Sequence, residues 1–123
     1  MDAEASDRAW AVHIGAVLTE AAAGRLLGRS PQAVRQDAGL LRLHNRDGAV
    51  VYPTIQFVGS GQVCGVADVV AILGSALLPL TIASWLTVPN RGLAGRTPIR
   101  PLQSGDRDRV LTLARQLASS AST

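Results

Sequence analysis

Three side chains that could read DNA lie close together in the first half of the chain. They are Gln32, Arg35 and Gln36, and they follow a Ser30–Pro31 pair. Serine is a favoured helix N-cap and proline is a favoured first helical residue, so this pair predicts the start of a helix. Glutamine and arginine can each make paired hydrogen bonds to base edges in the major groove. The segment is therefore predicted to be the second helix of a helix-turn-helix.

The residues in front of this helix suit a tight turn. Gly28 can take a left-handed backbone conformation, and a small residue in the preceding helix, Ala23 or Gly24, lets two helices cross closely. Arg29 and Arg42 flank the segment and are predicted to bind phosphates. The alternative is a helical hairpin packed for structure, whose polar side chains are only solvated.

A second candidate site lies in the second half of the chain, within Ala83–Gly105. Prolines and glycines alternate there with Leu93, Ile99 and Leu102, which would anchor the segment to a core. A flexible linker would not need such anchors, so the segment is predicted to hold a rigid surface. Interfaces often use arginine as an anchor, which makes Arg96 the preferred contact residue. The polar, turn-rich positions predicted to project are Asn90, Arg91, Gly92, Arg96 and Thr97.

The alternative for this segment is a purely structural loop. Trp85 and Leu86 would then be core residues, and the arginines at positions 91, 96 and 100 would be solvated. The two interpretations are compatible, because Trp85 is expected to lie in the core in both.

Neither a catalytic site nor a metal site is predicted. His13 and His44 lie far apart in the sequence, and no carboxylate pair or G-x-S-x-G serine accompanies them. Cys64 is the one cysteine, and no Cys/His cluster has zinc spacing. The glycines of residues 59–65 approach a dinucleotide loop but lack the strand and helix order and the ribose-binding acid. We expect a protein that is not an enzyme and that uses no metal or cofactor.

Length and composition limit the class of protein. With 123 residues, the chain suits one domain, or two small modules that share a core, and its 3% aromatic content predicts an aliphatic core. All twelve basic residues are arginine and nine residues are acidic, so a net charge of +3 permits either nucleic acid or an acidic protein as partner. The acidic start lacks the features of a signal peptide, and with a single cysteine this predicts a cytoplasmic location.

The segment Val69–Asn90 carries no charge and is long enough to span a bilayer. Pro79 would break its backbone ladder midway, which favours two short buried helices over a membrane span.

The fold is predicted to be mainly α-helical, with a short β-hairpin. Residues 1–60 would form a helix-turn-helix-like module with a hairpin wing, for DNA binding or dimerisation, and residues 61–123 a small helical domain. Capping and periodicity signals define the elements. Predicted helices cover Asp7–Val17, Glu20–Leu27, a segment from Pro31, Val66–Leu78, Thr81–Leu86 and a last helix that buries Val110, Leu111, Leu113, Ala114 and Leu117; the hairpin pairs Leu40–His44 with Val50–Tyr52, and Ser119–Thr123 forms a mobile tail.

The chain resembles the antitoxins of RES-type toxin–antitoxin modules, the Xre/MbcA/ParS family. The toxin-binding segment of that family reads roughly as tryptophan-leucine, proline-asparagine, leucine-x-glycine and threonine-proline. The matching residues here are Trp85, Leu86, Pro89, Asn90, Leu93, Gly95, Thr97 and Pro98. The runs Tyr52–Phe57 and Gly65–Val69 also resemble the middle of family members, so the resemblance spans most of the chain.

The resemblance implies a small homodimeric antitoxin that binds a RES-domain toxin, an NAD-consuming enzyme, and blocks its active site. It makes residues 61–123 a small helical toxin-binding domain. It also implies that the N-terminal half binds the operator of its own gene pair. The residues that it places at the toxin are Asn90, Arg91, Gly92, Arg96, Thr97, Pro98, Arg115 and Ser119. Those that it places at DNA are Gln32, Arg35 and Gln36, beside the phosphate contacts Arg29 and Arg42.

The alternative function is a stand-alone winged helix-turn-helix regulator. Such a protein would bind an operator without a toxin partner and would need no docking surface at Asn90–Pro98. A neighbouring reading frame for a RES-domain protein would favour the antitoxin. A third class, an independent small enzyme, would require turnover of a substrate by the isolated chain.

Overall fold

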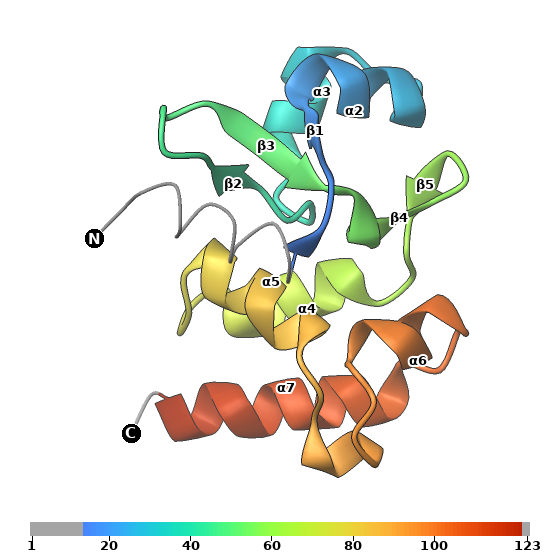
Figure 1. Cartoon of the computed structure of the whole chain (residues 1–123), viewed down its shortest axis with the longest axis vertical. Coiled ribbons are helices and arrows are strands. Elements are labelled where there is room, and N and C mark those ends of the chain that lie inside the picture. Colours follow the sequence, from blue (N-terminus) through green and yellow to red (C-terminus); the bar gives the residue numbers. More distant parts are fainter. Residues whose placement is uncertain (1–13, 122–123) are drawn as a thin grey trace.

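The computed structural model describes residues 14–121. The fold is mainly helical and includes two small sheets of short strands. Figure 1 shows the larger sheet with α2 and α3 at one end of the molecule and α7 at the other end. In chain order the elements are β1 (Val17–Thr19), α2 (Glu20–Leu27), α3 (Pro31–Gln36), β2 (Leu43–His44), β3 (Val50–Pro53), η1 (Thr54–Gln56), β4 (Phe57–Val58), β5 (Gly61–Gln62), α4 (Val66–Leu73), α5 (Pro79–Thr87), η2 (Arg91–Leu93), α6 (Ile99–Gln103) and α7 (Asp108–Ala121).

The predicted left-handed Gly28 and the predicted helix start at Ser30–Pro31 are confirmed. The Thr19 hydroxyl accepts a hydrogen bond from the Ala22 amide at 3.1 Å, and α2 ends at Gly28 with φ of 67°. The Ser30 hydroxyl caps α3, which begins at Pro31. Local sequence therefore sets both ends of α2 and the start of α3, because each cap satisfies backbone groups that the helix itself leaves unpaired.

The predicted hairpin is also present and belongs to a three-stranded sheet. The strand order is β1-β3-β2, and both pairs are antiparallel, with Leu43 opposite Val51. The Asn45 side chain closes the turn by accepting from the amides of Asp47 and Ala49, and Gly48 has φ of 84°. The predicted helix over 7–17 is wrong at its C-terminal end, because Val17 pairs with Pro53 as part of β1. Its first part, including Trp10, lies outside the described residues.

The second half differs in detail from the prediction. Helix α4 ends at Leu73 rather than Leu78, and α5 begins at Pro79, where proline lacks the amide that a helix interior needs. Helix α6 lies inside the segment that was predicted to be a loop. The predicted tail from Ser119 continues α7 as far as Ala121. Across residues 14–121 no helix is both long enough and apolar enough to cross a membrane.

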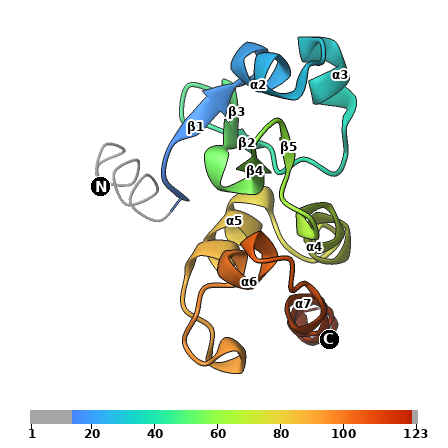
Figure 2. The same ribbon diagram turned by 90° about the vertical axis from the view of Figure 1, so that its right-hand side faces the viewer.

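One hydrophobic core joins the two halves. Ile14, Leu41 and Val51 from the first half pack in the same buried cluster as the helices α4, α5 and α7. A smaller cluster under α2 and α3 contains Val34 and Tyr52. Figure 2 shows the sheet resting on the α4 and α5 layer, with α6 and α7 beyond it. Because the main cluster is continuous, the position of the sheet is coupled to the packing of the C-terminal helices. Strand β3 contributes Val51 to the main cluster and Tyr52 to the smaller one, so it links α2 and α3 to that core.

Gln56 is a fully buried polar side chain at the junction of the halves. Its carboxamide donates to the Leu41 carbonyl and accepts from the Leu41 amide, both at 2.8 Å. It also donates to the Pro53 carbonyl and accepts from the side chain of Gln62. The Gln56 carbonyl accepts from the Val63 amide at 2.7 Å. One residue therefore ties the segment before β2, the end of β3 and the start of the C-terminal half together.

We expect Gln56→Leu to lower the free energy of unfolding by roughly 2–4 kcal/mol, because the buried amide and carbonyl of Leu41 would lose their partners. Urea unfolding followed by circular dichroism measures this change. Gln103→Leu removes an exposed amide side chain from α6 and serves as the control. Equal stability of the two variants would contradict a central role for Gln56.

Candidate functional site

Helices α2 and α3 approach each other so closely that only glycine fits at position 24. A Cβ atom on Gly24 would lie 2.6 Å from the Arg29 carbonyl oxygen, and the Arg29 amide donates to the Gly24 carbonyl at 2.9 Å. Val34 is fully buried and anchors one side of α3. The opposite side exposes Gln32, Arg35 and Gln36, the three residues that were predicted from the sequence to contact base edges. The structure therefore brings these three side chains together on one exposed face.

Arg35 is held by a carboxylate from α2. Its Nη2 and Nε atoms lie 2.6 and 2.9 Å from Oε1 of Glu20, whose Oε2 accepts from the Tyr52 hydroxyl at 3.0 Å. The hydrogen bond from Arg35 lowers the pKa of Glu20 and raises that of Arg35, while burial raises the pKa of Tyr52. The Arg35 side chain is 70% exposed, so its guanidinium is positioned on the face rather than enclosed.

Arg29 forms the second ion pair of this face. Its Nη1 atom lies 2.8 Å from Oδ2 of Asp37, and Oδ1 of Asp37 accepts from the Gly39 amide at 2.9 Å. The contact with Arg29 is the main reason that the pKa of Asp37 is lowered. The pair links the turn before α3 to Asp37, which is the residue at the C-terminal end of α3.

Arg42 lies beneath the face, where it contacts the C-terminal end of α3. Its guanidinium donates to the carbonyls of Val34 and Arg35 and to the Tyr52 hydroxyl, and it lies 5.5 Å from the centre of the Tyr52 ring. Cations at a helix C-terminus satisfy carbonyls that lack intrahelical partners. The phosphate contact predicted for Arg42 would require these hydrogen bonds to break.

Arg46 is a further candidate DNA contact that was not predicted from the sequence. Arg46 is exposed in the turn of the β2–β3 hairpin, which follows α3 along the chain. Arg46 could have been identified from the sequence, because it is a basic residue in the turn of the predicted hairpin wing.

The loop after α5 is a closed structure centred on Asn90. The Asn90 amide donates to the Arg96 carbonyl, and the Asn90 carbonyl accepts from the amides of Leu93 and Gly95, all at 3.0 Å. Its side-chain oxygen accepts from the Gly92 amide at 2.8 Å. Ala94 has φ of 58°, a strained conformation for a residue with a Cβ atom.

The C-terminal residues predicted to contact a partner fall on different surfaces. Arg91 and Arg96 are exposed on the Asn90 loop, whereas Thr97 is half-buried and Pro98 is buried. Gly92 packs against Leu113 of α7. Arg115 instead lines a groove between α7 and α4, and Ser119 lies further along α7. The loop and Arg115 therefore do not form one continuous site, because residues 113 and 115 point to different sides of a helix.

Between Ile14 and Ala121 no three His, Cys, Asp or Glu side chains are grouped closely enough to hold a metal ion.

The fold is similar to that of Rv2175c, whose structure was solved by NMR. The TM-score is 0.69 at 24% sequence identity, and the match covers 84% of this chain and 81% of that chain. No protein-family model and no curated protein matches the chain by sequence. At this identity the likeness to Rv2175c shows a common fold.

Acid is expected to destabilise the protein partly through Glu20 and Asp37. Because their pKa values are lower in the folded protein than in the unfolded chain, they stabilise the fold above their ordinary values of 4.5 and 3.8. This contribution is lost as the pH falls through the lowered values. Urea midpoints should therefore fall between about pH 7 and pH 3, and Glu20→Gln should reduce the fall. Asp47→Asn removes an exposed carboxylate outside this network as a control; an equal reduction there would refute the assignment to Glu20.

Proposed function

We propose that this protein binds DNA as a winged helix-turn-helix, with α3 in the major groove and the β2–β3 hairpin as the wing. The observation that carries the proposal is the exposed face of Gln32, Arg35 and Gln36 on a helix whose other side is buried. In helix-turn-helix proteins the second helix presents its first residues to base edges. Gln32 lies in the first turn of α3, where such a contact is expected.

Exposed arginines at this end of the molecule fit the same use. The exposed cations at this end of the molecule are Arg25, Arg29, Arg35 and Arg46. Glu20 and Asp37 hold Arg35 and Arg29 in fixed positions, and DNA phosphates would compete with these carboxylates for the guanidinium groups. Binding should therefore weaken steeply with added salt, because the arginines displace condensed counterions from the DNA phosphates and added salt opposes that release.

The first test is selection of binding sequences from random duplex DNA with the full chain, followed by anisotropy titrations. Gln32→Ala should weaken binding to the selected sequence by about 5- to 100-fold and leave non-specific binding unchanged, because it removes one base contact. Arg46→Ala should weaken both kinds of binding and reduce the salt slope by about one.

Arg100→Ala provides the matched control, because Arg100 is exposed on α6 in the other half of the molecule. Failure to enrich any sequence, or equal losses for Gln32→Ala and Arg100→Ala, would rule out the proposed face.

A second function is favoured by the Asn90 loop. We propose that the protein is also the antitoxin of a cytoplasmic RES-domain, NAD-consuming toxin, and that this loop docks on the toxin. Hydrogen bonds centred on Asn90 hold the loop in one shape, and Arg91 and Arg96 project from it. A preorganised loop loses little conformational freedom on binding, which favours affinity. DNA binding by the other half would then regulate expression of the gene pair.

Toxin docking predicts a specific effect of charge reversal in this loop. Arg91→Glu and Arg96→Glu should each weaken binding to the proposed RES-domain toxin by roughly 10- to 100-fold, since interface arginines often act as anchors. The protein to use in the test is the product of the neighbouring reading frame. Isothermal calorimetry measures the affinity, and cell growth with cellular NAD reports inhibition.

Arg100→Glu is the control for this experiment, and thermal unfolding verifies that each variant is folded. Arg96 also donates from Nε to the Leu93 carbonyl, so Arg91→Glu is the cleaner of the two variants. If the wild-type chain neither binds the RES-domain protein nor restores growth, the antitoxin proposal is wrong and only the DNA-binding proposal remains.

A further inference from the structure

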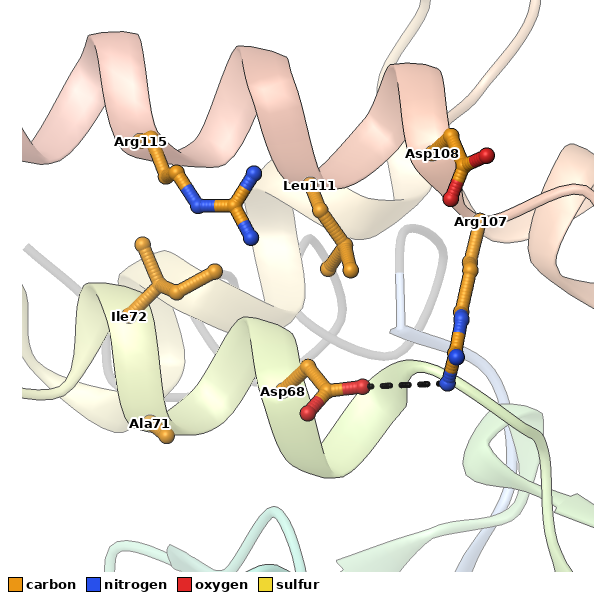
Figure 3. Close-up of a pocket in the computed structure, with 7 residues that line it drawn as sticks. All are labelled: Asp68, Ala71, Ile72, Arg107, Asp108, Leu111 and Arg115. Atoms are coloured by element: carbon orange, nitrogen blue, oxygen red, sulfur yellow. Dashed lines mark ion pairs between the residues drawn. The ribbon is translucent and has the colours of Figure 1, made fainter.

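A groove runs along the outer side of the C-terminal half, between α4 and α7. It has a volume of about 420 Å³. Figure 3 shows the two helices side by side and running in the same direction, with Ile72 and Leu111 in the space between them. Ala71 also lines the groove. Neither proposed function uses this surface.

The charges of the groove are arranged by position. At one end lie Asp68, Asp108 and Arg107, of which Asp68 and Arg107 form a 3.6 Å ion pair. At the other end lies Arg115. Two carboxylates and one guanidinium leave the first end with a net charge of −1, and Arg115 gives the second end +1. Asp108 and Arg115 have no ion-pair partner within residues 14–121.

This arrangement is self-complementary. Asp108 and Arg115 are seven residues apart, which is two helical turns or about 10 Å along α7. Suppose that two copies face each other through this groove and are related by a two-fold axis perpendicular to α7. The two α7 helices would then be antiparallel, and each end of the groove would lie against the opposite end of the groove in the second copy. Each copy would then contribute both Asp108 and Arg115 to the interface. An isologous interface uses the same surface of both copies in this way.

We propose that the α4–α7 groove is a self-association surface. In the dimer, Arg115 of each copy pairs with Asp108 of the other copy. The apolar floor of Ala71, Ile72 and Leu111 would be covered in both copies at once. A nucleic acid is disfavoured as occupant, because the groove as a whole carries no net charge and its rim includes two carboxylates.

The surface is compatible with DNA binding but does not depend on it. Helix α7 lies across the long axis of the molecule, and α2 and α3 lie at the far end of that axis (Figure 1). A two-fold axis perpendicular to α7 and along the long axis leaves both α2–α3 pairs at the same end of the dimer. Such a dimer would present two copies of α3 to one side, as proteins that bind palindromic sites do.

Sedimentation equilibrium of the full chain, without DNA or toxin, tests the proposal. The wild-type protein is expected to form dimers that weaken with added salt. Asp108→Arg and Arg115→Asp should each raise the dimer dissociation constant about 100-fold or more, because both attractive pairs become repulsive. An equimolar mixture of the two variants should restore the dimer, since both contacts are then between opposite charges.

The mixture also controls for folding, because neither variant could rescue the other if it had lost its structure. Arg100→Asp carries the same charge reversal on α6, outside the groove, and should dimerise like the wild type. A monomeric wild-type chain at all concentrations would overturn the proposal. A dimer that neither substitution weakens, or a mixture that stays monomeric, would also overturn it.

Discussion

The buried carboxamide of Gln56 is the interaction on which the arrangement of the two halves depends. It pairs with both backbone groups of Leu41, which lies in the buried segment before β2, and its own carbonyl holds the segment that leads to α4. A buried amide without partners would be costly, so the three segments are held at one spacing. The apolar cluster that contains Leu41, Val51 and the helices α4, α5 and α7 forms around this junction.

Hydrogen bonds and ion pairs within the protein limit the contacts that three arginines of the N-terminal half can make with DNA. Arg42 satisfies carbonyls at the end of α3, and Arg35 and Arg29 are held by Glu20 and Asp37. A charge count therefore overstates the cationic surface that a DNA duplex would meet. The same pairs fix the position of α3 relative to α2 and the sheet. Stability and the proposed DNA recognition consequently share side chains at this end of the molecule.

The fold separates three candidate surfaces. The face of α3 and the hairpin lie at one end, the Asn90 loop projects at the other, and the α4–α7 groove opens along the side of the C-terminal helices (Figures 1 and 3). Each surface is built on elements that the common core orients. Contacts with DNA, with a protein partner and with a second copy could therefore be made together. Coupling between them would pass through α4 and α7, which pack against each other and against the core.

Several features of the fold follow from local chemistry that can be read in the sequence. Thr19, Gly28 and Ser30 define helix ends, and Asn45 with Gly48 defines the hairpin turn, because each acts on backbone groups a few residues away. Strand β1 and the place of Arg42 were decided by tertiary structure, since their partners lie many residues along the chain. The separation of Arg115 from the Asn90 loop was also decided there, because it depends on which side of α7 packs against η2 and which against α4.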